Sequence, residues 1–267
     1  FLHPALKRPN LRVEIGVDLR RVLIEQGRAA GVEVRRSGVT LQARARREVI
    51  LATGSINTPK LLMLSGIGDG AKVVVYSQHA PFWATRLWWQ LRFEGFDDVA
   101  VLDGGLPAWK AAGGAVTTDP STPTAREFTG DRRPHLIRST DEVAQAVDDE
   151  GTLLGNVLGE EDYRGETTTY PRPGHIPASV NFPVAQLVDP ATGRLLPISE
   201  LRPAFEAAGL LNPERAIVTY CGGGIAATGV AWALAQAGVQ DVGVYDGSLT
   251  AWTADPDRPL VTGASPR

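Results

Sequence analysis

An internal repeat of an α/β unit constrains the fold of this 267-residue chain more than any other feature. Tyr76 precedes Asp103 by 27 positions, and Tyr220 precedes Asp246 by 26. Two further pairs stand at matching places: Ala84-Thr85 with Ala227-Thr228, and Trp109 with Trp252. Each copy predicts a strand, a loop, a helix, a second strand, an Asp-Gly turn and a short helix. That order is half of a doubly wound parallel sheet.

The two copies differ in what precedes them. The second copy, residues 135–267, begins with α/β material of its own, including a helix at 140–149 that Ser139 or Thr140 caps, with Glu142 close behind. The first copy, residues 69–117, has no such front half, because residues 1–68 are of another type. Tryptophans stand at helical or post-turn spacings in both copies, which predicts that their rings are buried: Trp88, Trp89, Trp109, Trp232 and Trp252.

Residues 1–68 read as a small β-rich segment. Short alternating runs at 11–15, 21–24, 31–35 and 39–46 predict an antiparallel meander, followed by a strand at 48–52 and a helix that contains Pro59. This segment holds 12 basic and 5 acidic side chains, without interleaved aromatic residues. We interpret the charge as a solvated face and not as a nucleic-acid arm. Residues 118–134 have the composition of a linker.

Composition excludes several classes of protein. The chain is 43% hydrophobic, and no run approaches the ~20 apolar residues of a membrane span. The four histidines are scattered singly, so we expect no metal site. The one cysteine rules out an internal disulfide and fits a reducing compartment, so we expect a cytoplasmic protein.

That cysteine stands where chemistry is expected. Cys221 follows a predicted buried strand at 216–220 and precedes Gly222, Gly223, Gly224, Ile225 and Ala226, where a helix begins. Glycines let the backbone curl, so successive N–H groups of the loop and of the helix end converge on one point. Such amides favour a thiolate over a thiol and would also stabilise the terminal charge of a persulfide. The pattern predicts sulfur transfer through Cys221 without a cofactor.

The cysteine allows other interpretations. A lone cysteine at a strand end is often core filler, but three consecutive glycines after it favour a functional loop. A cysteine phosphatase or arsenate reductase needs an arginine six residues after the nucleophile, where this chain has Ala227. A catalytically impaired fusion or truncation product that acts as a binding module remains open.

The segments Tyr220-CGGGIAAT, Gly174-His-Ile-Pro177 and Asp246-Gly-Ser resemble the catalytic domain of two-domain rhodaneses. Residues 101–109 resemble the back half of their inactive first domain. The resemblance implies a rhodanese-like doubly wound parallel sheet, with a complete second copy and a partial first. It also implies sulfur transfer from a small anionic donor, thiosulfate or 3-mercaptopyruvate, to a thiophilic acceptor such as cyanide or a thiol. The family's Asp-x-Arg is replaced by Asn156 and Leu158.

Residues 1–68 resemble an internal fragment of glucose-methanol-choline flavin oxidoreductases, through Arg47-Glu-Val-Ile-Leu and Ser55-Ile-Asn-Thr-Pro59. The fragment lacks that family's phosphate-binding glycine loop and its catalytic histidine region. We therefore predict no flavin binding and no cofactor.

Four further residues have expected roles. Arg164 and Arg172 flank the cleft that the resemblance implies and are candidate contacts of an anionic donor, although a solvated surface position is the commoner role of an arginine. His175 is expected to stabilise a turn between two prolines. Asp246 is expected to cap the helix that follows it.

Overall fold

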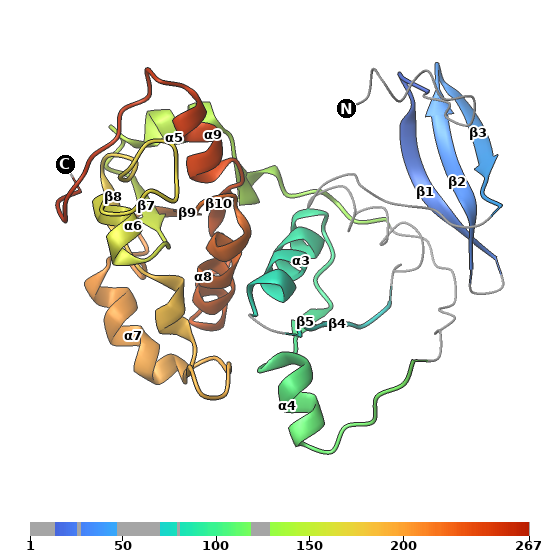
Figure 1. Cartoon of the computed structure of the whole chain (residues 1–267), viewed down its shortest axis with the longest axis horizontal. Helices are drawn as coiled ribbons and strands as arrows, with labels where there is room; N and C mark the ends of the chain where they lie inside the picture. Colours follow the sequence, from blue (N-terminus) through green and yellow to red (C-terminus); the bar gives the residue numbers. More distant parts are fainter. Residues whose placement is uncertain (1–13, 26–27, 47–69, 79–80, 119–128, 267) are drawn as a thin grey trace. The chain divides into compact units, whose positions relative to one another are not determined.

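The computed structural model describes residues 14–25, 28–46, 70–78, 81–118 and 129–266. The chain divides into two compact units, one of residues 1–71 with 118–129 and one of residues 72–117 with 130–267 (Figure 1). The predicted strand at 48–52 and the helix around Pro59 lie outside the described residues.

The first unit contains an antiparallel sheet in the order β1-β2-β3. Its strands are β1 (Asp18–Glu25), β2 (Arg28–Arg36) and β3 (Val39–Arg44). Every residue of β3 is exposed, and Arg21 on β1 pairs with Glu33 on β2 at 3.2 Å. The predicted meander is therefore present. Of the strand predicted at 11–15, only Glu14 and Ile15 are described, and neither belongs to a strand.

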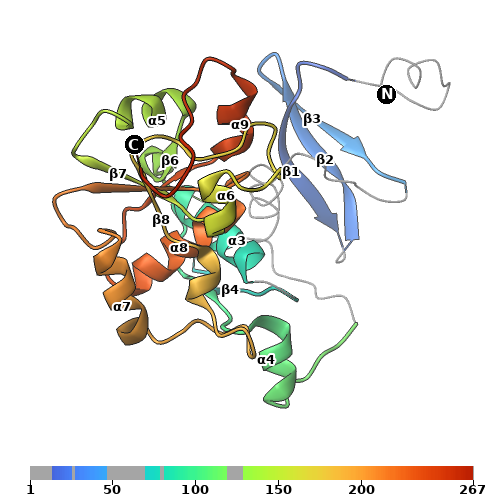
Figure 2. The ribbon, with the colours of Figure 1, turned by 60° about the vertical axis from the view of Figure 1, so that its left-hand side comes forward.

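The second copy forms a five-stranded parallel sheet in the order β6-β10-β9-β7-β8 (Figures 1 and 2). The strands are β6 (Ile137–Arg138), β7 (Thr152–Asn156), β8 (Ser179–Asn181), β9 (Ala216–Tyr220) and β10 (Gly243–Tyr245). Strand β9 lies at the centre, and its last four residues are buried. Because all strands run in one direction, the residue after β9, Cys221, lies at the carboxyl edge of the sheet.

Helices cover both faces of this sheet. Figure 1 shows α5 (Thr140–Ala146) and α9 (Ser248–Ala254) on one face, and α7 (Ile198–Ala207) and α8 (Ile225–Gln236) on the other. Short elements complete the domain: η1 (Pro134–Leu136), α6 (Glu160–Arg164) and η2 (Val184–Leu187). The predicted cap of α5 is confirmed, since Ser139 and Glu142 form a reciprocal capping box.

The first copy repeats the back half of this arrangement. Strands β4 (Val73–Val75) and β5 (Val99–Val101) pair in parallel, and α3 (Phe82–Phe93) and α4 (Gly105–Ala111) follow them. Helix α3 packs against its counterpart α8. At their contact the hydroxyl oxygens of the matching residues Thr85 and Thr228 lie 3.1 Å apart. The repeat in the sequence is therefore also a repeat in space.

The front half present in the second copy decides which repeated side chains are buried. Tyr220 is fully buried, while Tyr76 is 57% exposed. Trp252 packs with Val143 of α5 and Leu154 of β7, and the described part of the first copy has no counterpart of these elements. Trp109 is accordingly 45% exposed, so its predicted place in a core is wrong. The other four tryptophans that we expected in cores are buried.

Candidate active site

Cys221 is 3% exposed and begins the loop of residues 221–226, called here the cysteine loop. Its N–H donates to the hydroxyl of Ser248 at 3.1 Å, and that hydroxyl donates to the carbonyl of Tyr245 at 2.8 Å. Ser248 follows β10 and has a left-handed backbone, with φ of 48°. The start of α9 thus holds the start of the cysteine loop.

The carbonyl groups of the cysteine loop are tied to neighbouring residues. The N–H of Leu249 donates to the carbonyl of Cys221 at 3.0 Å, and the N–H of Thr250 donates to that of Gly222 at 2.9 Å. In a trans peptide the N–H points away from the carbonyl of the same plane. The N–H groups of Gly222 and Gly223 therefore point away from α9. Neither they nor the N–H of Ile225 donates a hydrogen bond to another residue of the described chain.

Within the cysteine loop, Gly224 directly precedes α8 and has a left-handed φ of 75°. Its carbonyl accepts from Nη1 of Arg86 at 2.9 Å, and Nη2 of the same guanidinium pairs with the carboxylate of Asp246 at 2.5 Å. The prediction that Asp246 caps α9 is wrong. The cap position is Gly247 and no side chain caps that helix, because the carboxylate is held by Arg86. Sequence reasoning did not find Arg86; a charged residue inside a helix of buried apolar residues was the available signal.

Tyr170 is a second residue that the sequence did not indicate. A Cβ added at Gly222 would come within 2.2 Å of the Tyr170 hydroxyl. The pKa of Tyr170 is raised above its ordinary value, first by burial and then by the nearby Cys221 and Asp162. The hydroxyl therefore stays protonated beside the cysteine loop.

Arg164 and Arg172 have protein partners. Arg164 pairs with Glu160 one turn earlier in α6, at 2.9 Å. Arg172 donates to the carbonyls of Asp255 and Arg258, both at 2.8 Å. The structure thus gives each guanidinium a structural contact, and a contact with an anionic donor stays a prediction for both.

His175 is fully buried, and both ring nitrogens face carbonyl oxygens: Nδ1 lies 2.7 Å from that of Tyr163 and Nε2 lies 3.1 Å from that of Ser265. The ring stacks on Tyr163 with 3.6 Å between centroids. Burial lowers the pKa of His175 below its ordinary value. These contacts fit the expected role in stabilising a turn.

Asn156, where the resemblance implies an aspartate, is buried at the end of β7. Its side-chain oxygen accepts from the N–H of Leu158 at 2.9 Å. This local turn takes the place of an ion pair between the two positions. Leu158 packs against the core cluster that contains Tyr220 and Trp252.

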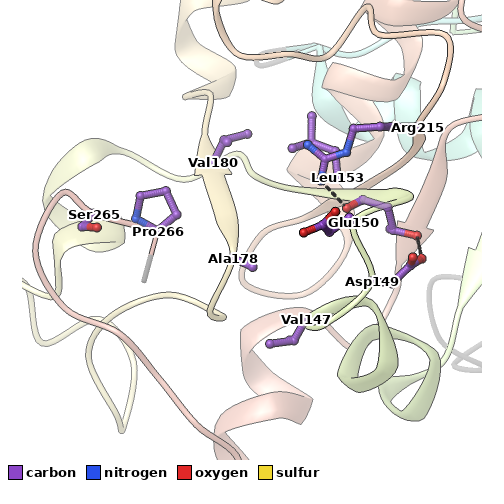
Figure 3. Close-up of a pocket in the computed structure, with 10 residues that line it drawn as sticks. Val147, Asp149, Glu150, Leu153, Ala178, Val180, Arg215, Ser265 and Pro266 are labelled. Carbon is purple, nitrogen blue, oxygen red and sulfur yellow. Dashed lines mark hydrogen bonds between the residues drawn. The ribbon is translucent and has the colours of Figure 1, made fainter.

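A cavity of about 580 Å³ lies at the opposite, amino edge of the sheet (Figure 3). Thr152, the first residue of β7, and Arg215, which directly precedes β9, both line it. It is therefore separate from the cysteine loop. No group of three or more potential metal ligands occurs among the described residues. Within the same residues, no helix has the length and apolar character needed to cross a bilayer.

The chain matches two protein families. The rhodanese-like domain family matches residues 47–112 and 139–255, so both copies of the repeat are included. The GMC oxidoreductase family matches residues 1–79, in agreement with the resemblance of the N-terminal segment.

Curated relatives match most of the chain. The chain is 34% identical over 200 residues to the "Probable 3-mercaptopyruvate sulfurtransferase" of Pseudomonas aeruginosa, covering 74% of this chain and 70% of that protein. It is 32% identical over 220 residues to the mitochondrial thiosulfate/3-mercaptopyruvate sulfurtransferase 1 of Arabidopsis thaliana, covering 73% of this chain but 57% of the relative.

A solved structure has a similar fold over most of the chain. The anaerobic ergothioneine biosynthesis enzyme from Chlorobium limicola, solved with trimethyl histidine, superposes with a TM-score of 0.68 at 25% identity. The match covers 77% of this chain and 54% of that one. The chain thus spans little more than half the length of this structure.

Proposed function

Since the chain belongs to the rhodanese-like family, we propose that it is a sulfurtransferase that moves a sulfane sulfur through a persulfide on Cys221. One observation carries the proposal: hydrogen bonds from outside the loop hold the carbonyls of Cys221, Gly222 and Gly224. This leaves the N–H groups of Gly222, Gly223 and Ile225 available to surround a negatively charged sulfur.

The proposed cycle has two displacement steps. The Cys221 thiolate attacks the outer sulfur of thiosulfate, the S–S bond of the donor breaks, and sulfite leaves with the bonding electrons. The outer sulfur now forms a persulfide anion on Cys221. An acceptor such as cyanide or a thiolate then attacks that sulfur, and the electron pair returns to the Cys221 sulfur. The cycle requires no external oxidant, reductant or cofactor.

Access to the sulfur is the main structural demand on this proposal. Cys221 is 3% exposed, and the Tyr170 hydroxyl occupies the space beside Gly222. We propose that Tyr170 moves when the donor enters. The same burial favours the second candidate, a catalytically impaired member of the family that acts as a binding module.

The donor, the acceptor and the compartment belong to the proposal as well. Relatives with thiosulfate or 3-mercaptopyruvate in their names support these two donors. The neutral side chains of the cysteine loop do not distinguish between them. A single free cysteine that must stay reduced favours a cytoplasmic location.

Thiocyanate formation tests the two candidates against each other. The purified full chain is incubated with cyanide and either thiosulfate or 3-mercaptopyruvate, beside Cys221→Ser. The sulfurtransferase predicts turnover with at least one donor that disappears in the variant. Absence of turnover with both donors, from protein that unfolds cooperatively, would favour the binding module.

A further inference from the structure

Arg86 links the first copy of the repeat to the cysteine loop of the second. It lies on α3, and 4% of its side chain is exposed. Its guanidinium carbon lies 4.8 Å from the centre of the Trp89 ring. A buried guanidinium needs acceptors nearby, because leaving water is costly for a charge. Arg86 finds them in the carbonyl of Gly224 and the carboxylate of Asp246.

The hydrogen bond to Gly224 fixes the orientation of one peptide plane. The carbonyl of Gly224 and the N–H of Ile225 belong to the same trans peptide, so they point in opposite directions. Because Nη1 of Arg86 holds the carbonyl at 2.9 Å, the N–H of Ile225 is directed away from α3. Gly224 permits this geometry, since an added Cβ would lie 3.1 Å from the same Nη1.

The ion pair with Asp246 extends the link to the start of α9. Asp246 comes two residues before Ser248, which accepts the N–H of Cys221. The backbone N–H groups of Leu249 and Thr250 donate to the carbonyls of Cys221 and Gly222. One guanidinium therefore connects the two segments that set the direction of the loop amides.

We propose that Arg86 is a positioning residue, which turns the Gly224–Ile225 peptide so that its N–H faces the reacting sulfur of Cys221. The inference rests on the proposed function, because it assigns the loop amides to that sulfur. It adds that the first copy of the repeat, which has Ser77 at the place of Cys221, supplies part of the order of the active site.

Only the first copy contributes an arginine to the other copy in this way. By the spacing of the repeat, the counterpart of Arg86 is Gly229 and the counterpart of Asp246 is Asp103. Asp103 accepts from the N–H of Leu195 at 2.7 Å. The first copy thus has an arginine at the position that reaches the cysteine loop, and the second copy has a glycine at the matching position.

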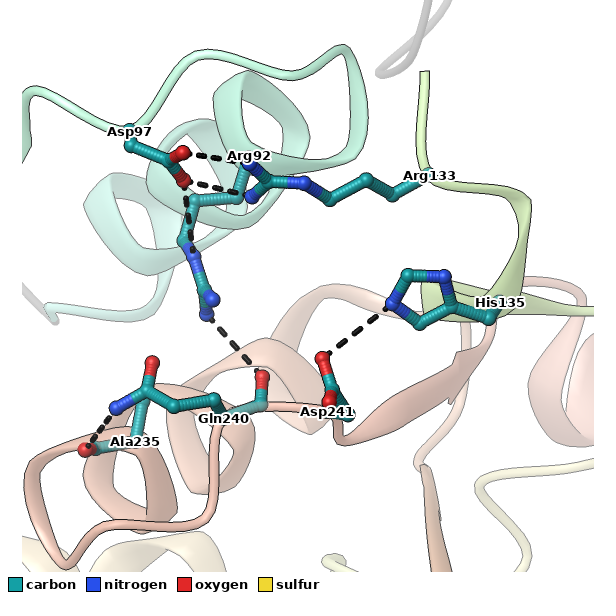
Figure 4. A network of polar contacts seen from close by, with 7 residues as sticks. All are labelled: Arg92, Asp97, Arg133, His135, Ala235, Gln240 and Asp241. Carbon is teal, nitrogen blue, oxygen red and sulfur yellow. Dashed lines mark hydrogen bonds and ion pairs between the residues drawn. The ribbon is translucent and has the colours of Figure 1, made fainter. Parts of the chain in front are cut away.

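Arg92 offers a matched control on the same helix (Figure 4). Its guanidinium carbon lies 5.0 Å from the centre of the Trp88 ring, and Nη1 donates to the carbonyl of Gln240 at 3.4 Å. Its hydrogen bond to Gln240 also joins α3 to a backbone carbonyl of the second copy, while its ring contact, like that of Arg86, lies within α3. Among the described residues, no hydrogen bond or ion pair joins Arg92 to the cysteine loop.

The test measures the reactivity of the single cysteine in the full chain with Arg86→Met and Arg92→Met. Iodoacetamide alkylation is followed across pH, and persulfide formation with thiosulfate is followed by intact mass. We expect Arg86→Met to move the alkylation midpoint to higher pH and to slow persulfide formation by about tenfold or more. Arg92→Met should leave both unchanged, even where it lowers the unfolding temperature.

A double variant separates positioning from charge. Arg86→Met alone leaves Asp246 without its counter-ion, whereas Arg86→Met with Asp246→Asn removes both charges. The proposal predicts that the double variant stays slow, because the Gly224 carbonyl still lacks its donor. A return to the wild-type midpoint and rate in the double variant would overturn the proposal, and so would equal effects of Arg86→Met and Arg92→Met.

The test remains decisive if the variant does not fold or if the wild-type chain forms no persulfide. If Arg86→Met does not fold, Arg86→Lys replaces it, since lysine keeps the charge but lacks the planar fork that reaches both acceptors; a wild-type midpoint in that variant would also refute the proposal. If the wild-type chain forms no persulfide, the proposed function fails. The alkylation midpoints then still decide whether Arg86 orders the amides around Cys221.

Discussion

The close backbone contact at Gly224 gives a quantitative prediction for Gly224→Ala. Gly224 has φ of 75°, and an added Cβ would lie 2.7 Å from the carbonyl oxygen of Asp246 and 2.9 Å from its Oδ1. The first of these atoms belongs to the backbone, so it cannot rotate away.

Two costs combine in this variant. A residue with a Cβ loses roughly 1–2 kcal/mol in the left-handed conformation. An extra methyl in a packed site costs about 1–3 kcal/mol when the backbone must shift. Together they lower the free energy of unfolding by roughly 2–5 kcal/mol. The shift also moves the peptide that Arg86 holds, so we expect persulfide formation to fall as well.

Gly223→Ala is the matched control for this measurement. Gly223 is exposed, has no heavy atom within 4 Å of an added Cβ, and lies outside the left-handed region. Urea unfolding of the two variants is compared with wild type, and single-turnover persulfide formation is followed by intact mass. Equal stability of Gly224→Ala and Gly223→Ala would refute the argument from close contact and backbone conformation.

Three further predictions concern residues around the loop. Tyr170→Ala removes the side chain beside Gly222 and should speed iodoacetamide alkylation of Cys221; an unchanged rate would mean that Tyr170 does not restrict access. Ser248→Ala leaves the N–H of Cys221 without its acceptor and should lower the free energy of urea unfolding by about 1–3 kcal/mol. His175 has a lowered pKa in the fold, so an unfolded histidine with the ordinary value of 6.5 binds protons first as pH falls. Its contribution is therefore complete above about pH 6.5 and is lost below it, and His175→Gln should show a smaller loss of stability between about pH 7.5 and 5.5; an equal loss would contradict this sign.

Repeated anchors in the sequence were enough to predict the main architecture. The matching Ala-Thr pairs predicted equivalent helices, and Thr85 and Thr228 meet where α3 packs on α8. The strand before Cys221 and the helix after it were also predicted correctly, because both depend on local patterns of hydrophobic residues and glycine. Of the three glycines between them, only Gly224 has a positive φ.

Contacts between residues far apart in the sequence could not be predicted in this way. Arg86 and Gly224 are 138 positions apart, so no local spacing connects them. Asp246 looked like a helix cap because Asp before Gly-Ser is common at helix starts, but a buried guanidinium is the stronger partner for its carboxylate. Trp109 shows the converse: its place in the repeat predicted burial, and the elements that bury Trp252 have no described counterpart in the first copy.

Cys221 is proposed to carry the transferred sulfur as a persulfide. The most direct measurement is the intact mass of the reduced chain after brief exposure to thiosulfate, since the chain has one cysteine. We expect a gain of one sulfur atom that cyanide removes and that Cys221→Ser never acquires. A wild-type mass that does not change, or a gain that persists in Cys221→Ser, would contradict it.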